Sequence, residues 1–104
     1  MIFVGPLRKC RGPWGGGQGC DLISDESEFE LVRFAQAIAV NPAWLRRGRG
    51  DRPCPRFTIS PRCRVRALEF GAVESNEPGM VEAFIRYRDR RYGPLRRRHV
   101  DRLG

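Results

Sequence analysis

Residues 57–74 constrain the fold most, because they carry the signals of a complete strand–helix–strand unit. Residues 57–59 alternate apolar and polar side chains, which is the period of a short strand. Ser60 and Pro61 predict the start of a helix, since serine caps free amides and proline needs no donor at the first helical position. Gly71 predicts the end of that helix, and a second strand follows.

A second helix is predicted to begin within residues 24–30. Either of two capping boxes, Asp25 with Glu28 or Ser27 with Glu30, fits its first turn, and acidic residues suit the positive end of a helix dipole. Its predicted apolar stripe consists of Leu31, Phe34, Ala35 and Ile38. These acidic residues therefore have a structural explanation, and we do not interpret them as catalytic.

The remaining patterns complete an α/β fold. Residues 2–4 and 20–23 read as strands, and residues 80–92 as a third helix. The predicted buried side of this helix consists of Met80, Val81, Phe84 and Ile85, with Tyr87 or Arg88. Because strand–helix–strand units join parallel strands, we predict three to four short strands in a mostly parallel sheet with three helices. The chain is predicted to be a single domain over residues 1–94, followed by a basic tail over residues 95–104.

Residues 7–19 are rich in glycine and are predicted to form a loop. A phosphate-binding glycine loop needs a helix directly after it, whereas a strand is predicted at residues 20–23. The sequence therefore favours a mobile or partner-ordered loop over a phosphate cradle.

The charge is strongly positive and almost entirely due to arginine. The net charge is +8, and Lys9 is the only lysine among 20 basic residues. Such a bias arises from GC-rich codons or from selection for bidentate phosphate contacts. The positive charge falls mainly in residues 40–66 and 79–104, which favours either a polyanion partner or a solvated, highly charged surface. No apolar run reaches membrane-span length, so a cytoplasmic protein that does not bind membranes is expected.

The predicted nucleic-acid contacts are arginines of a glycine-containing loop, of the helix after Pro61 and of the tail. They are Arg46, Arg47, Arg49, Arg52, Arg62, Arg66, Arg96, Arg97 and Arg98. The loop and the first half of the helix are expected to form one positive surface, with the tail as a second grip. Trp44 is interpreted as a core anchor rather than a stacking platform, because Leu45 beside it is also apolar. His99, in the tail, has no neighbour that would orient it as a base.

Four cysteines raise the question of a zinc site. They are Cys10, Cys20, Cys54 and Cys63. Structural zinc sites use close pairs of ligands, and these spacings are wider, so unligated cysteines are favoured over zinc or a disulfide. No cofactor is predicted, with zinc as the alternative.

The chain resembles an uncharacterised family of short actinobacterial and phage proteins over roughly residues 1–75. The resemblance rests on residues 20–25 (Cys-Asp-Leu-Ile-Ser-Asp) with the helix that follows, and on residues 55–74, which end in Gly-Ala-Val-Glu. The helix and tail after Gly79 lie outside it. The resemblance implies a fold and a phage or actinobacterial source, not a reaction.

Polar positions of that family are largely replaced in this chain. Typical members carry an aspartate after the first strand, a histidine after the cysteine and a Pro-His-Tyr-Asp-Leu stretch. Gly5 or Pro6, Asp21 and residues 55–59 (Pro-Arg-Phe-Thr-Ile) stand at these positions here. Any catalytic activity of the family is therefore expected to be lost.

Three functions follow as hypotheses. The first is a small non-enzymatic, phage-type protein that contacts the RNA or DNA backbone through its arginines. The second is a phage-type accessory protein that acts in the host cytoplasm. It would bind the acidic surface of a host protein or nucleoprotein machine and modulate it. An exposed patch including Trp14, Trp44 or Tyr92 would favour it. The third is a hydrolase or nuclease that uses Asp21 or Asp25, which we disfavour because no catalytic residue is recognisable.

Overall fold

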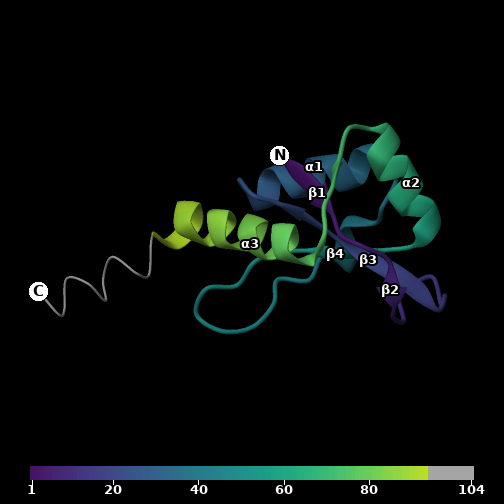
Figure 1. The fold of residues 1–104 in the computed structure, drawn as a ribbon, viewed down its shortest axis with the longest axis horizontal. Helices are drawn as coiled ribbons and strands as arrows, with labels where there is room; N and C mark the ends of the chain where they lie inside the picture. Colours follow the sequence, from purple (N-terminus) through teal and green to yellow (C-terminus); the bar gives the residue numbers. More distant parts are fainter. Residues whose placement is uncertain (94–104) are drawn as a thin grey trace, which may run out of the picture.

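The sheet is organised around β3 (Gln18–Ser24), the longest strand of the computed structural model, which describes residues 1–93 (Figure 1). β1 (Ile2–Val4) pairs with one side of β3 and β4 (Phe57–Ile59) with the other, both antiparallel. β2 (Arg8–Lys9) pairs with the first residues of β3, and β5 (Val73–Glu74) lies parallel to β1. The described chain therefore forms a single α/β domain with a five-stranded mixed sheet.

Three α-helices and one short 3₁₀ helix pack on this sheet. α1 (Glu28–Ala37) and α2 (Pro61–Glu69) cover one face, and α3 (Glu77–Tyr92) covers part of the other. η1 (Pro42–Trp44) follows α1 and leads into the long loop before β4. In Figure 1, α3 runs out past the edge of the sheet, so that only its first half lies over the strands.

Side chains that alternate along the strands build two cores. The larger core joins Ile2, Val4, Cys20, Leu22, Phe57 and Ile59 of the strands to Leu31, Ala35, Ile38 and Ala67 of α1 and α2. The smaller core joins Phe3 and Ile23, on the opposite face, to Met80 and Ala83 of α3. This alternation is what a sheet covered on both faces requires. Trp44 and Leu45 pack against the larger core, which confirms the interpretation of Trp44 as an anchor.

The prediction of a mostly parallel sheet is wrong, although the strand–helix–strand unit behind it exists. β4 and β5 run in the same direction, but β3 and β1 lie between them. Because β3 is antiparallel to its three neighbours, β1, β2 and β4, the pair of β1 and β5 is the single parallel pair of the described sheet. The local signals of residues 57–74 specify the connection from β4 through α2 to β5. They do not specify which strands lie between β4 and β5 in the sheet.

The predicted helix caps are confirmed. The Ser60 hydroxyl accepts a hydrogen bond from the amide of Cys63 at 3.1 Å, with Pro61 in the first turn. Gly71 follows α2 with a φ of +101°, in the region that glycine favours. Ser27, the second of the two alternatives, caps α1 and accepts from the amide of Glu30 at 3.1 Å. Leu31, Ala35 and Ile38 are buried along the predicted stripe, and Phe34 packs beside them.

The glycine-rich segment is partly a hairpin, which the loop prediction missed. β2 pairs with the start of β3, and Trp14 in the connecting turn folds back over three glycines. A Cβ at Gly12, Gly16 or Gly19 would lie 2.0, 2.3 or 2.9 Å from the nearest indole atom. The close approach of the Trp14 ring therefore explains three of the glycines in this segment, Gly12, Gly16 and Gly19.

The buried side of α3 is only partly as predicted. Met80, Ala83 and Tyr87 are buried, and Phe84 packs beside the smaller core. Val81 and Ile85 are 55% and 50% exposed, contrary to the prediction, because α3 overlaps the sheet only along one narrow side. α3 also begins earlier than predicted, at an Asn76 cap whose side chain accepts from the amide of Gly79 at 2.8 Å.

The predicted basic tail, including His99, lies outside the described residues. Among the helices that the structure does describe, none has the combined length and apolar character needed to cross a membrane.

Candidate nucleic-acid interface

Most of the predicted loop arginines belong to a closed loop over residues 46–56, which we call the arginine loop. At its neck, Arg46 and Arg56 form an antiparallel bridge. The amide of Arg46 donates to the carbonyl of Arg56 at 2.9 Å, and the amide of Arg56 donates back at 2.8 Å. Trp44 and Leu45 hold the start of the loop on the larger core, and β4 continues from its end. The loop therefore has a fixed base.

The two arginines at the neck share one face of the bridge, because residues directly opposite each other point to the same side. Together with Gly48 and Arg49 they line a hollow of about 400 Å³, which we call the arginine pocket. Gly48 has a φ of +82°, a turn that suits glycine and returns Arg49 to the same side as the neck. Within residues 1–93, no carboxylate lines this pocket.

Arg47 points away from the arginine pocket and serves the structure. Its Nε and Nη2 donate to the two carboxylate oxygens of Glu28 on α1, at 3.1 and 3.0 Å. These hydrogen bonds raise the pKa of Arg47 above its ordinary value. The pair ties the arginine loop to the first turn of α1.

The second half of the arginine loop is tied to α3. Arg52 lies 5.3 Å above the ring of Tyr92 and donates to the carbonyl of Gly93. The Tyr92 hydroxyl donates to the carbonyl of Pro53 at 2.7 Å, and Nε of Arg88 donates to the carbonyl of Arg52 at 3.0 Å. Arg52 is therefore a structural contact as well as a predicted site residue.

The predicted single positive surface is not formed by α2 and the arginine loop. Figure 1 shows the loop beneath α3, at the end of the molecule away from α2. Arg66 on α2 donates to the carbonyl of Ile38 at 2.7 Å and so caps the end of α1, whereas Arg62 is exposed on α2. Arg96, Arg97 and Arg98 lie outside the described residues.

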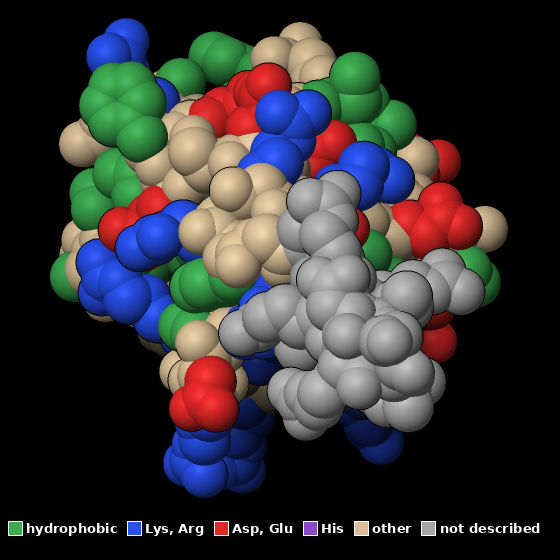
Figure 2. All heavy atoms as spheres, turned by 90° about the vertical axis from the view of Figure 1, so that its left-hand side faces the viewer, with side chains coloured by type: hydrophobic (Ala, Val, Ile, Leu, Met, Phe, Trp, Pro, Cys, Tyr) green, Lys and Arg blue, Asp and Glu red, His purple; other side chains and the backbone are tan. Residues whose placement is uncertain are grey.

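Basic side chains are spread over the face of the molecule in Figure 2. Lys and Arg side chains project from its lower edge and left side, and others lie at its top left and upper centre. Most of the Asp and Glu side chains visible there lie higher on the face and to its right. The arginine loop is among the lowest parts of the molecule in Figure 1, which shares its vertical axis with this view.

Arg56 was missed as a candidate, although the structure places it directly opposite Arg46. Its sequence signal is weak, because it stands ten positions away in a segment predicted to lead into a strand. Only the closure of the arginine loop brings the two side chains together.

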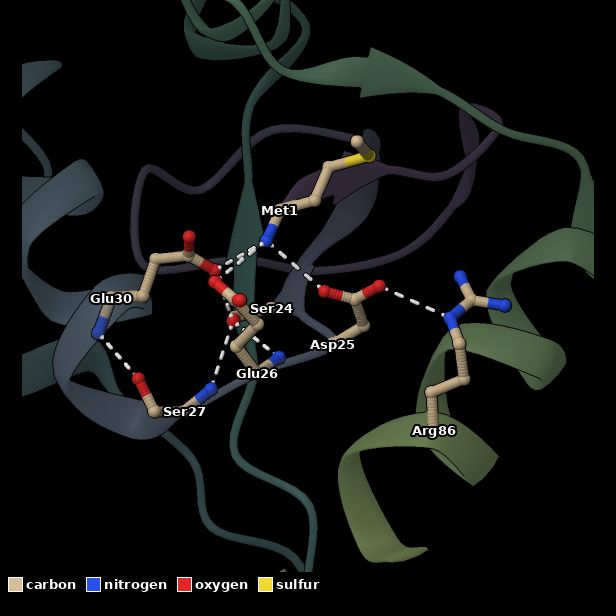
Figure 3. A network of polar contacts seen from close by, with 7 residues as sticks. All are labelled: Met1, Ser24, Asp25, Glu26, Ser27, Glu30 and Arg86. Carbon is tan, nitrogen blue, oxygen red and sulfur yellow. Dashed lines mark hydrogen bonds and ion pairs between the residues drawn. The ribbon is translucent and has the colours of Figure 1, made fainter. Parts of the chain in front are cut away.

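The acidic residues before α1 form a closed network (Figure 3). The α-amino group of Met1 lies 3.0 Å from Asp25, 3.2 Å from Glu26 and 2.8 Å from Glu30. Asp25 also accepts from Nε of Arg86 on α3 at 3.1 Å. Burial, the largest single effect, would raise the pKa of Asp25 and of Glu30. Hydrogen bonds from the α-amino group, together with those from Arg86 to Asp25 and from Ser24 to Glu30, outweigh it, and both pKa values are lowered. The network therefore holds the sheet, α1 and α3 together.

The two aspartates of the enzyme hypothesis are both paired with cations. Asp25 belongs to the network around Met1, and Asp21 accepts from Arg8 at 3.2 Å. Over residues 1–93, no three His, Cys, Asp or Glu side chains are grouped as a metal ion would require. The geometry thus gives these aspartates structural partners and no shared site.

The four cysteines, the zinc candidates, are all free thiols. Cys20 and Cys54 are buried, and burial raises the pKa of each to about 11. Cys63 packs against the larger core, and Cys10 lies against Gly19 in the hairpin. The raised pKa keeps the thiols of Cys20 and Cys54 protonated at neutral pH in the metal-free protein.

No protein family, curated protein or solved structure matches this chain. The resemblance to a family of short actinobacterial and phage proteins therefore stays a prediction.

Proposed function

We propose that this protein is a small non-enzymatic binder that contacts the phosphates of RNA or DNA through the arginine loop. The observation that carries the proposal is the arginine pocket, where Arg46, Arg49 and Arg56 converge on one hollow. Guanidinium groups match phosphate oxygens in bidentate geometry, and their charge-assisted hydrogen bonds are the strong ones. Phosphate contacts position a polynucleotide without reading its sequence, so weak sequence preference is expected.

The charge state of the pocket supports this function. The ion pairs described in residues 1–93 involve Arg8, Arg47, Arg64 and Arg86, and none involves the three arginines of the pocket. The neighbouring Arg47, by contrast, is paired with Glu28, so paired and unpaired arginines follow one another within the same described loop. Three cations that have no ion-pair partner within the described part of the chain create a focused positive potential that favours an anionic ligand.

The test is binding of labelled mixed-sequence RNA and DNA, single-stranded and duplex, over a series of salt concentrations. We expect an affinity that falls with salt, because bound phosphates release counter-ions. Arg49→Gln should weaken binding of all sequences similarly and lower the magnitude of the salt slope by about 1. Absence of binding at low salt would refute the proposal.

The matched control is Arg11→Gln, which removes one exposed arginine from the hairpin turn between β2 and β3. It changes the net charge as Arg49→Gln does, but at a site away from the arginine pocket. If both variants weaken binding equally, the overall charge and not the pocket is responsible. Arg62→Gln tests in the same way whether α2 contributes.

A second candidate is an accessory protein that binds a protein partner. The predicted sign was an exposed patch including Trp14, Trp44 or Tyr92, and all three side chains are half-buried. The observation that favours this candidate is instead the exposure of Val81 and Ile85, one turn apart on α3. Replacing both by Ser should leave nucleic-acid affinity unchanged if the arginine pocket is the site.

A further inference from the structure

We propose that the arginine pocket holds the terminal phosphomonoester of a polynucleotide, rather than an internal phosphodiester. This inference rests on the proposed function and specifies the phosphate group that the pocket takes. It follows from the number of cations, from their position around one pocket and from the contacts that hold the other two arginines of the loop, Arg47 and Arg52, to the rest of the described protein.

The first step is the match of charge and oxygen atoms. A phosphomonoester carries a charge of about −1.5 to −2 at pH 7 and three acceptor oxygens, whereas a phosphodiester carries a single negative charge and two such oxygens. Three arginines line the arginine pocket, and no carboxylate is among its lining residues. The monoester therefore neutralises more of the pocket's charge and offers each arginine an oxygen of its own.

The second step concerns the neighbours of the pocket. A polynucleotide backbone presents a row of phosphates, and a protein that follows it needs a row of available cations. Beside the pocket, Arg47 is paired with Glu28, and Arg52 lies on Tyr92 and Gly93. Three arginines of the loop thus line one pocket. The other two, Arg47 and Arg52, are held by other groups of the protein.

The third step is size. The pocket of about 400 Å³ lies within the range of small-molecule sites, roughly 300–1,000 Å³. It has room for a phosphate and the sugar that carries it. Its neck is fixed by the two backbone hydrogen bonds between Arg46 and Arg56, so the backbone that carries two of the cations is in place before a ligand arrives.

The experiment compares oligonucleotides of one sequence that carry a 5′-phosphate, a 3′-phosphate or only hydroxyl ends, as RNA and as DNA. We expect at least one phosphorylated end to strengthen binding about tenfold or more, since charge-assisted bidentate contacts are added. The 5′ and 3′ arms identify the end that is bound. Inorganic phosphate should compete with the phosphorylated oligonucleotide.

Two variants and a pH series sharpen the result. Arg49→Gln should remove most of the advantage of the phosphorylated end, whereas Arg49→Lys, which keeps the charge but loses the fork, should retain part of it. Arg11→Gln should leave the ratio unchanged. The second pKa of a phosphomonoester is about 6, so the advantage should shrink when the pH is lowered to about 5.5.

The outcomes separate this inference from the proposed function. Equal binding of phosphorylated and hydroxyl ends, with both weakened by Arg49→Gln, would overturn end recognition and leave backbone binding in place. Failure of every oligonucleotide to bind at low salt would overturn both. A phosphate advantage that survives Arg49→Gln would place the end group elsewhere and overturn this assignment.

Discussion

Arg46 and Arg56 face each other across the neck of the arginine loop, with no carboxylate lining the pocket between them. Like charges directly opposite each other in a β-bridge are destabilising, and the cost falls when an anion binds between them. The repulsion between these two arginines therefore lowers the free energy of unfolding of the free protein, and a bound anion would reduce that loss. Arg47, one residue further, shows the alternative, because its charge is matched by Glu28.

Arg56→Gln tests this cost at the level of one residue. The substitution removes one of two facing charges and keeps the backbone bridge, so the free energy of unfolding at low salt should rise by about 0.2–1 kcal/mol. Polynucleotide binding should weaken in the same variant. Urea unfolding at low and high salt measures the effect, which should shrink as salt screens the repulsion. A loss of stability at low salt would contradict the repulsion argument.

The network around Asp25 and Glu30 predicts a loss of stability in acid. Burial opposes ionisation, but hydrogen bonds from the α-amino group, with Arg86 at Asp25 and Ser24 at Glu30, lower both pKa values. A lowered pKa in the folded state stabilises the protein above the unfolded value, about 4, and this stabilisation is lost as the pH falls through the folded pKa.

Urea unfolding between neutral pH and pH 3 should therefore show a declining free energy of unfolding, and Asp25→Asn should decline less steeply. A matched control is Glu82→Gln, because Glu82 is an exposed residue of α3 that lies outside this network. Identical slopes for the protein and Asp25→Asn would contradict the role given to this network.

At the scale of elements, local signals predicted helix ends and strands well, and long-range pairing poorly. Ser60, Pro61 and Gly71 mark α2 because a cap depends only on neighbours in sequence. The insertion of β3 and β1 between β4 and β5 depends on contacts between segments far apart in the chain, and no residue near α2 encodes it. β2 was missed because its two residues carry no apolar period.

α3 buries fewer of its apolar side chains than its sequence suggests, because Met80 is buried whereas Val81 and Ile85 are exposed. Met80→Ala should lower the free energy of unfolding by about 2–5 kcal/mol, since Met80 is buried in the smaller core. Val81→Ala should have a near-neutral effect, because Val81 is more than half exposed and alanine is the better helix former. Equal losses in the two variants would show that α3 packs by the other side.

At the scale of the whole molecule, the composition predicted a polyanion partner. It could not predict which arginines are held by contacts within the fold and which are available to a ligand. Twenty basic residues are a property of the sequence, whereas their division into structural and available arginines depends on the fold. Arg47, Arg64 and Arg66 are engaged by Glu28, Glu74 and the carbonyl of Ile38. Arg46, Arg49 and Arg56 meet only because the arginine loop closes on itself.

The most direct test of this account is a magnetic-resonance titration that follows the Nε–H signals of the arginine side chains as an oligonucleotide is added. The account predicts that the largest shifts belong to Arg46, Arg49 and Arg56. The signals of Arg64 and Arg66, which are held by the fold, should move little. Largest shifts at Arg62 on α2, or no shift at the arginine pocket when the oligonucleotide binds, would contradict the central claim.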